Sequence, residues 1–276
     1  MSDVISISRT TATATAPVKS DSKYPTELIE LPSKGYFYSS DNPLSKGVVE
    51  MKMMSAREED ILANETLIRE GIEILLDRLL ESLLIDKTIK VSDLFFGDKN
   101  ALFIAARRLA YGDEYGPLEI VCNKCGLENK ETFINLGNLN TKEYDFSEKE
   151  KGKNVFEFTL PFSKRKVGVK ILNGKDELEI VAELKALAKI SKAGHEITTR
   201  LKKFIVSVDG DTNPTTVRSF VENELLSRDS IELRKFHRTL SPNIDLSFSF
   251  KCEHCEAEER MGVPLTARFF WPESGA

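Results

Sequence analysis

Two Cys-x-x-Cys pairs constrain the fold of this chain more than any other feature of its sequence. They are Cys122/Cys125 and Cys252/Cys255, and together they use all four cysteines. Each pair follows an apolar, strand-like run and is followed by a polar turn and further strand-like sequence. Two β-hairpins that each contribute two thiolates to one tetrahedral metal ion form a zinc ribbon. The sequence therefore predicts a structural zinc ion held by these four cysteines.

The separation between the two pairs is unusual for a zinc ribbon, which places about 15–20 residues between its cysteine pairs. If one ion binds all four sulfurs here, the long intervening segment must start and end at the same place, and the entropy of closing such a loop grows slowly with its length. Two alternatives stay open: four reduced, partly buried thiols, or two disulfides. A catalytic metal is disfavoured because four thiolates leave no open coordination position. His254 is an alternative ligand, or a solvated turn residue.

Composition narrows the class of protein. The chain has 276 residues, of which 41% are hydrophobic and 30% charged, which allows a core and a well-solvated surface. A net charge of −5 disfavours nucleic acid as the main partner, because phosphate binding needs a concentrated basic face. No apolar run is long enough for a transmembrane helix, and the N-terminus lacks the apolar core of a signal peptide. Paired cysteines without an export signal indicate synthesis in a reducing cytosol.

Changes in composition along the chain predict five parts. Residues 1–25, rich in Ser, Thr and Ala, are expected to form a disordered N-terminal arm. Residues 26–135 read as a β-arm, a helical bundle and the first zinc knuckle, and residues 136–154 as a polar linker excursion. Residues 155–243 form a second hairpin and helical unit, and residues 244–276 a second zinc knuckle and an aromatic tail.

Helix signals are clearest in the first half of the chain. Ser55 and Glu58 form a capping box that predicts a helix start, and Gly71 predicts a break after it. Asp98 is expected to cap a further helix over residues 99–110. In the second half, helices are expected at about 176–191, 196–206 and 214–229.

A weak internal similarity links the two halves. Leu31-Pro32-Ser33-Lys34 is echoed by Leu160-Pro161-Phe162-Ser163-Lys164, and each segment is followed by strand-like sequence, then helices, then a cysteine pair. This order suggests a duplicated unit of about 100 residues whose two knuckles meet across a pseudo-twofold axis. The expected fold is therefore α+β, with two related β-hairpin-plus-helical-bundle units joined by a split four-cysteine zinc ribbon.

Two aromatic clusters are candidate partner-binding surfaces. Tyr36, Phe37 and Tyr38 follow a glycine turn and are strand-like, and either form an exposed binding surface or pack on the helices that follow. Phe270 and Trp271 belong to the tail, which either covers the ribbon or acts as a docking peptide.

Sequence patterns for catalysis are missing from the chain. It contains no phosphate-binding glycine-rich loop, no G-x-S-x-G and no H-E-x-x-H motif. Its histidines, at positions 195, 237 and 254, are scattered. We therefore expect a binding or assembly protein and not an enzyme.

Several segments together carry a family resemblance: 31–38, 47–62, 93–100, 106–115 and the first knuckle with Gly126. Over roughly residues 28–260 the chain resembles the baseplate hub assembly and hub subunit family of T-even-type contractile-tailed bacteriophages. The resemblance implies a non-enzymatic protein whose partners are other hub and tail proteins. It implies a location in the host cytoplasm during assembly, and in the tail baseplate of the virion if the protein is retained.

The zinc prediction rests on the cysteines alone, because the resemblance does not imply a metal. Neither nucleic acid nor a membrane is an expected partner, and a homo-oligomer stays open. A zinc-ribbon factor that binds nucleic acid or regulates expression is the alternative function. An enzyme that uses the ribbon as a scaffold is a third class, for which the sequence offers no catalytic group.

Overall fold

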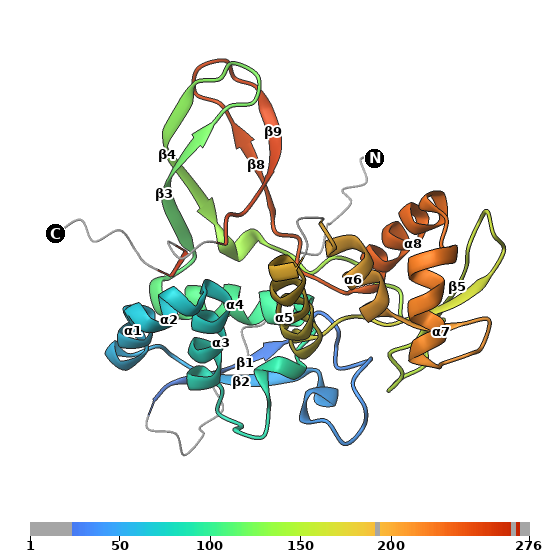
Figure 1. Cartoon of the computed structure of the whole chain (residues 1–276). Coiled ribbons are helices and arrows are strands. Elements are labelled where there is room, and N and C mark those ends of the chain that lie inside the picture. The colour runs from blue at the N-terminus through green and yellow to red at the C-terminus, as the bar shows by residue number, and fades with distance from the viewer. Residues whose placement is uncertain (1–23, 191–193, 266–268, 271–276) are drawn as a thin grey trace, which may run out of the picture.

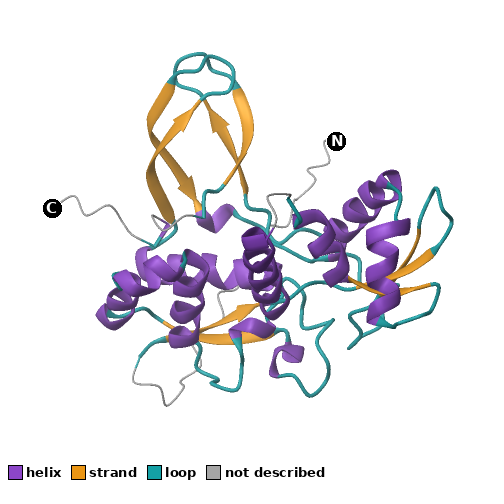
Figure 2. Ribbon diagram, in the orientation of Figure 1, coloured by secondary structure: helices purple, strands orange, loops and turns teal. Residues whose placement is uncertain are grey.

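Helices and small antiparallel sheets build the body of the protein, and two hairpins rise from it as one projection (Figure 1). The computed structural model describes residues 24–190, 194–265 and 269–270. The mixed α+β class expected from the sequence is confirmed. Figure 2 shows that the helices lie in the body, whereas the projection consists of strands and turns. Within the described residues, no helix is long and apolar enough to cross a membrane.

The first half of the body packs helices on a two-stranded sheet. Strand β1 (Thr26–Glu30) pairs antiparallel with β2 (Val48–Lys52), so that Ile29 lies opposite Val49. The helices that follow are α1 (Ala56–Leu62), α2 (Glu65–Glu70), α3 (Ile72–Leu83) and α4 (Phe96–Tyr111). Helix α3 buries one leucine face, whose spacing is that of a helix packed on a core: Leu75, Leu79, Leu80 and Leu83.

Two predicted helix signals in this half are confirmed. Ser55 is the N-cap of α1, and its capping box with Glu58 is formed. Glu58 is fully buried, where it pairs with Lys52 and accepts a hydrogen bond from Ser82. Gly71 separates α2 from α3 with φ of 136°, a backbone conformation that a side chain would strain.

Asp98 does not cap a helix, so that prediction was wrong. Helix α4 begins at Phe96, which makes Asp98 its third residue, and the carboxylate is fully buried. Asp98 accepts hydrogen bonds from the backbone N–H of Ser33 (2.9 Å), from Ser33 Oγ (2.7 Å) and from Tyr38 Oη (2.7 Å). The carboxylate therefore ties the turn after β1 to α4.

The segment from Tyr36 to Tyr38 is not a strand, contrary to the prediction. It forms turns, and Phe37 and Tyr38 are buried at 2% and 5% exposure. The ring of Phe37 packs edge-on against Phe156, and Tyr38 stacks on Phe95. Aromatic rings with several buried ring partners form core instead of a regular sheet edge.

The second half repeats the pattern of a hairpin followed by helices. Strands β5 (Phe156–Thr159) and β6 (Lys166–Val169) form the predicted hairpin. Helices α5 (Gly174–Ile190), α6 (Glu196–Phe204), α7 (Pro214–Ser219) and α8 (Ser227–Leu240) follow, with a π-helical turn η4 (Phe220–Glu224) after α7.

A third strand of this sheet was not predicted. Residues Ile205–Val208 form β7, which pairs with β6, although the sequence suggested that a helix continues to residue 206. The helix ends because Ile205, Val206 and Val208 are β-branched, and Ile205 and Val208 are buried in the sheet.

Residues 136–154 are irregular, as expected, yet part of the segment packs against the body. Short helix η3 (Leu136–Asn138) begins it, and Leu136 is fully buried. Tyr144 and Phe146 contact the ring of Phe37, so the segment covers the aromatic core of the first half.

Candidate metal centre

The projection consists of two β-hairpins that carry the two cysteine pairs at its far end (Figure 1). Strands β3 (Glu114–Val121) and β4 (Glu128–Asn135) form the first hairpin, and β8 (Ser247–Lys251) and β9 (Glu258–Gly262) the second. Each Cys-x-x-Cys turn, called a knuckle below, connects the two strands of its hairpin. The two hairpins together are called the ribbon.

The structure brings all four predicted metal ligands together. Their sulfur atoms lie within 4.8 Å of one another, with Cys122 Sγ 3.7 Å from Cys255 Sγ and Cys125 Sγ 3.7 Å from Cys252 Sγ. Sulfurs that bind a tetrahedral zinc ion at about 2.3 Å lie about 3.8 Å apart. A disulfide needs an S–S distance of about 2.05 Å, so the spacing fits four ligands of one ion and excludes bonded pairs in this conformation.

The two knuckles share one backbone conformation. In the first, the N–H of Lys124 points to Cys122 Sγ (3.4 Å), and in the second the N–H of His254 points to Cys252 Sγ (3.4 Å). The residue after the second cysteine has positive φ in both: 72° at Gly126 and 55° at Glu256. Backbone N–H groups directed at a sulfur stabilise its thiolate form, which is the form that binds metal.

Side chains from each hairpin also reach across to the other knuckle. Asn129 is buried, accepts a hydrogen bond from the N–H of Glu253 (2.8 Å), and directs its amide nitrogen towards Cys252 Sγ (3.6 Å). At the matching place in the second hairpin, Glu259 accepts a hydrogen bond from the Asn123 side chain (2.7 Å). These reciprocal contacts hold the two knuckles face to face and orient the metal ligands.

His254 is not among the clustered ligand atoms. Its Nε2 lies 3.0 Å from the backbone carbonyl oxygen of Glu128, and its side chain is at the surface. The residue therefore links the second knuckle to β4 and leaves the metal position to the four cysteines.

The cysteines differ strongly in acidity when no metal is bound. Burial opposes ionisation of Cys252, but hydrogen bonds from the N–H groups of Cys255 and His254 and from Asn129 outweigh it and lower its pKa to about 6. The N–H of Ala257 favours the thiolate of Cys255, but burial and the three neighbouring sulfurs outweigh it and raise its pKa to about 12. One thiolate in a group of thiols is the expected state of an empty four-sulfur site, because like charges at this distance repel.

These observations fit a structural zinc ion. Four sulfurs at tetrahedral spacing, two of them on buried cysteines, complete the coordination of Zn²⁺ and leave no position for a substrate or water. Such an ion, when bound, supplies folding energy and no reaction. The ligand set would be Cys122, Cys125, Cys252 and Cys255.

The predicted partner-binding residues that the structure describes lie away from the knuckles, in other parts of the chain. Phe37 and Tyr38 lie in the core, so they follow the packing alternative that the sequence left open. Phe270 is also buried, against the rings of Phe103 and Phe269 at the base of the ribbon, and does not cover the knuckles. Trp271 lies outside the described residues.

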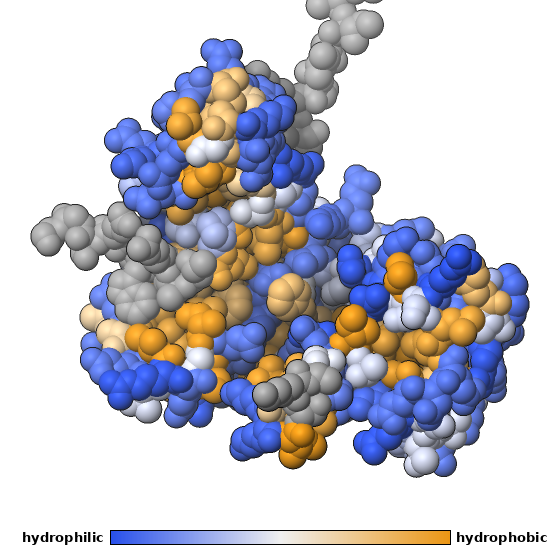
Figure 3. Space-filling model, turned by 45° about the horizontal axis from the view of Figure 1, so that its top comes forward, coloured by the Kyte–Doolittle hydropathy of each residue, from blue (hydrophilic) through white to orange (hydrophobic). Residues whose placement is uncertain are grey.

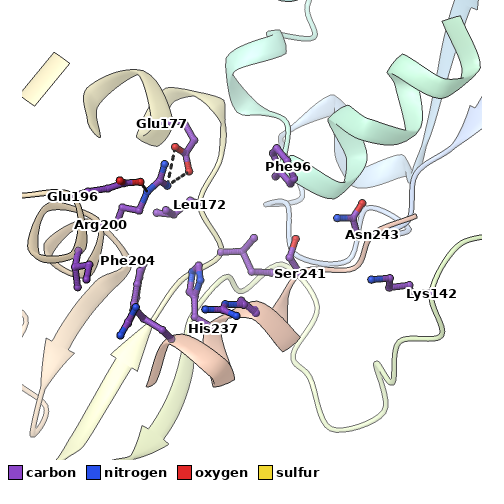
Figure 4. Close-up of a pocket in the computed structure, with 14 residues that line it drawn as sticks. Phe96, Lys142, Leu172, Glu177, Glu196, Arg200, Phe204, His237, Ser241 and Asn243 are labelled. Carbon is purple, nitrogen blue, oxygen red and sulfur yellow. Dashed lines mark hydrogen bonds and ion pairs between the residues drawn. The ribbon is translucent and has the colours of Figure 1, made fainter. Parts of the chain in front are cut away.

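One feature that the sequence did not indicate is a cavity of about 680 Å³ between the two halves of the body (Figure 4). Arg200 on α6 projects into it, and its Nη1 donates hydrogen bonds to both carboxylate oxygens of Glu177 on α5 (2.9 and 3.0 Å). His237 on α8 also lines the cavity, and burial lowers its pKa. No local motif marks these residues, because they come from separate elements that only the tertiary fold brings together.

Comparison with known proteins identifies one family. The sequence model of the T4 bacteriophage base plate protein family matches residues 27–271, a range that includes both knuckles. No curated protein matches the chain, and no solved structure matches it. The resemblance inferred from sequence segments is thus confirmed at the level of a baseplate protein.

Proposed function

The chain belongs to the T4 bacteriophage base plate protein family, and from this membership we propose that it builds or helps to assemble the baseplate hub through protein–protein contacts. The match over residues 27–271 is the observation that carries the proposal, because it covers both halves of the body and the ribbon. The protein would act in the host cytoplasm during assembly, and would lie in the tail baseplate of the virion if it is retained.

The role proposed for the ribbon is structural. A zinc ion bound by Cys122, Cys125, Cys252 and Cys255 would tie together two hairpins that share no backbone ladder. Without such a link, each two-stranded hairpin would be only marginally stable. We propose that the ribbon is a stiff arm that keeps a fixed orientation during assembly.

We further propose that the two halves of the chain are related units. Both contain a hairpin, then helices, then a ribbon hairpin, in the same order. In both, the turn after the first strand is bound by a buried carboxylate at the third position of a later helix: Asp98 in α4 and Asp229 in α8. The sequence separation between turn and carboxylate is similar in the two halves: 65 residues between Ser33 and Asp98, and 66 between Ser163 and Asp229.

A nonsense mutation in the phage gene tests the proposed function. Infection of a non-suppressing host should yield incomplete baseplates, and electron microscopy with sedimentation of the lysate should show peripheral subassemblies without a completed hub. Supplying the protein from a plasmid should restore complete baseplates. Normal baseplates in the absence of the protein would contradict the proposal.

Virions of the unmodified phage show whether the protein stays in the particle. Quantitative mass spectrometry of purified virions should give a fixed ratio to known tail proteins if the protein is a subunit. A protein required for hub formation but missing from virions would instead be an assembly factor.

A further inference from the structure

The cavity between the two halves has a basic wall. Four cations line it, on residues Lys142, Arg200, Arg234 and Arg238, but only two carboxylates, those of Glu177 and Glu196. Both carboxylates are paired with Arg200. The side chains of Lys142 and Arg238 are exposed and, within the described residues, form no hydrogen bond or ion pair, although Lys142 has a longer-range electrostatic interaction with Asp245. In a protein of net charge −5, this wall favours an acidic occupant.

The same cavity has an apolar floor that continues into a second hollow. Phe96, at the N-terminus of α4, is 62% exposed and lines both the first cavity and a neighbouring one of about 530 Å³. Leu172 also lines both, and Ile72 and Leu178 lie exposed at the second, which the carboxylates of Glu73 and Asp77 line as well. Figure 3 shows a hollow in the surface beside the ribbon, where hydrophobic and hydrophilic side chains adjoin. The two hollows together are called the groove below. An occupant that fits the groove must carry apolar as well as acidic side chains.

The far end of the ribbon has this combination. Val121 and Leu127 flank the first knuckle and are 56% and 51% exposed. Glu128 lies opposite Val121 in the β3–β4 ladder and pairs with Lys130 (3.8 Å). Glu253 lies in the second knuckle and Glu256 directly after it, and the side chains of all three glutamates are exposed. Four thiolates around one divalent ion would add further negative charge at this end. The ribbon end is called the tip below, and comprises residues 121–128 and 251–258.

We propose that the tip of one copy of this chain docks into the basic groove of a second copy. The tip has exposed apolar side chains and more carboxylates than cations: Glu128, Glu253, Glu256 and Glu258 against Lys124 and Lys251. The first cavity has an apolar floor and more cations than carboxylates, so charge and hydrophobicity are complementary. The two surfaces are different patches of one chain, which makes the contact heterologous. Repeated contacts of this kind produce a ring if the rotation closes, or a filament if it does not.

Self-association of the full-length protein is the first test. Analytical ultracentrifugation from about 5 to about 500 µM should show species larger than the monomer at low salt, and fewer of them at high salt, because exposed charges are screened within about 10 Å at 0.1 M ionic strength. A monomer across this whole range at low salt would overturn the proposal.

Charge reversal tests the contribution of each of the two surfaces by itself. A tip variant, Glu253→Lys with Glu256→Lys, and a groove variant, Lys142→Glu with Arg238→Glu, should each weaken self-association by at least about tenfold. Mixed in equal amounts, the two variants should associate again, because the intact groove of the first accepts the intact tip of the second, and the reversed tip of the first faces the reversed groove of the second. Association in the mixture that neither variant shows alone is specific to a contact between tip and groove, since an interface that joins two tips or two grooves would be lost in only one of the variants.

Matched controls carry the same two charge reversals elsewhere. Glu148→Lys with Glu150→Lys, and Lys151→Glu with Lys153→Glu, lie on the exposed part of the 136–154 segment, outside the tip and the groove, and should associate like the unmodified chain. Phe96→Ser should weaken association without changing the net charge, because it removes the exposed ring shared by both hollows. Association that is unaffected by the tip and groove variants, or equally affected by the controls, would overturn the proposal.

Discussion

Asp98 and Asp229 each bind the turn that follows the first strand of their half of the chain. Both are fully buried third residues of a helix. Asp229 accepts hydrogen bonds from the N–H groups of Phe162 (2.8 Å) and Ser163 (3.0 Å), and Asp98 accepts one from the N–H of Ser33 (2.9 Å). In each half, one carboxylate therefore fixes a strand-end turn to the helix that leads into the ribbon.

These two carboxylates should respond differently to replacement by asparagine. Both oxygens of Asp229 face backbone N–H groups, which cannot accept, so the amide of Asp229→Asn would leave buried donors facing each other. One oxygen of Asp98 instead faces the hydroxyls of Ser33 and Tyr38, which can accept a hydrogen bond from an amide. We expect Asp229→Asn to lower the free energy of unfolding by about 1–3 kcal/mol, and Asp98→Asn by clearly less. Urea denaturation measures both, and equal losses would contradict this account.

Gly97 should be irreplaceable for steric reasons. A Cβ atom at this position would lie 1.9 Å from the carbonyl oxygen of Pro242, on the segment that leads to the second ribbon hairpin. Overpacking of this kind costs about 1–3 kcal/mol, and more where backbone must move. Thermal denaturation should show a large loss for Gly97→Ala and almost none for Gly194→Ala, which has open space around it. Similar melting temperatures for both variants would show that α4 does not contact this segment.

Acid should destabilise the first half through Glu58. Burial opposes its ionisation, but hydrogen bonds from Lys52, Ser55 and Ser82 outweigh this and lower its pKa from 4.5 to about 2. A carboxylate with a lowered folded-state pKa stabilises the fold above the unfolded pKa and loses that contribution as the pH falls towards the folded value. Stability should therefore fall between about pH 4.5 and pH 2.

Glu58→Gln checks the origin of this acid sensitivity. The variant should be less stable than the unmodified protein at pH 7, and should lose less stability between about pH 4.5 and pH 2. Denaturant titrations at several pH values measure both effects. Glu59→Gln, at the exposed neighbouring position, is the control and should keep the original pH dependence. An unchanged slope in Glu58→Gln would assign the acid sensitivity to other carboxylates.

A zinc-release assay should distinguish the four cysteine ligands from His254. Cys255→Ala removes one of four clustered sulfurs and should abolish tight zinc retention, whereas His254→Ala should retain zinc because its ring contacts the carbonyl of Glu128. Release into a chromogenic chelator gives the comparison directly. Zinc loss in His254→Ala with retention in Cys255→Ala would place the ligands elsewhere.

Local signals in the sequence predicted those features that depend on a few neighbouring residues. The capping box at Ser55, the break at Gly71 and the hairpin of β5 and β6 were predicted because each depends on short-range geometry. The cysteine spacing likewise predicted that the two pairs meet, since a metal site requires its ligands to converge.

Features that depend on distant partners could not be predicted in the same way. Asp98 looked like an N-cap because aspartate favours that position, and only its contact with Ser33, 65 residues away, explains its place inside α4. The aromatic residues from Tyr36 to Tyr38 favour a strand by propensity, but burial against Phe95 and Phe156 determines their conformation. The role of Asn129 between the knuckles has no sequence signal at all.

Native mass spectrometry of the purified, reduced protein tests the central claim, that one metal ion joins both knuckles of a single chain. We predict a monomer at low concentration with one zinc ion, which is lost together with the folded ribbon when Cys122 or Cys252 is replaced by serine. A metal-free folded protein, or a zinc ion present only in dimers that pair one knuckle from each chain, would contradict it.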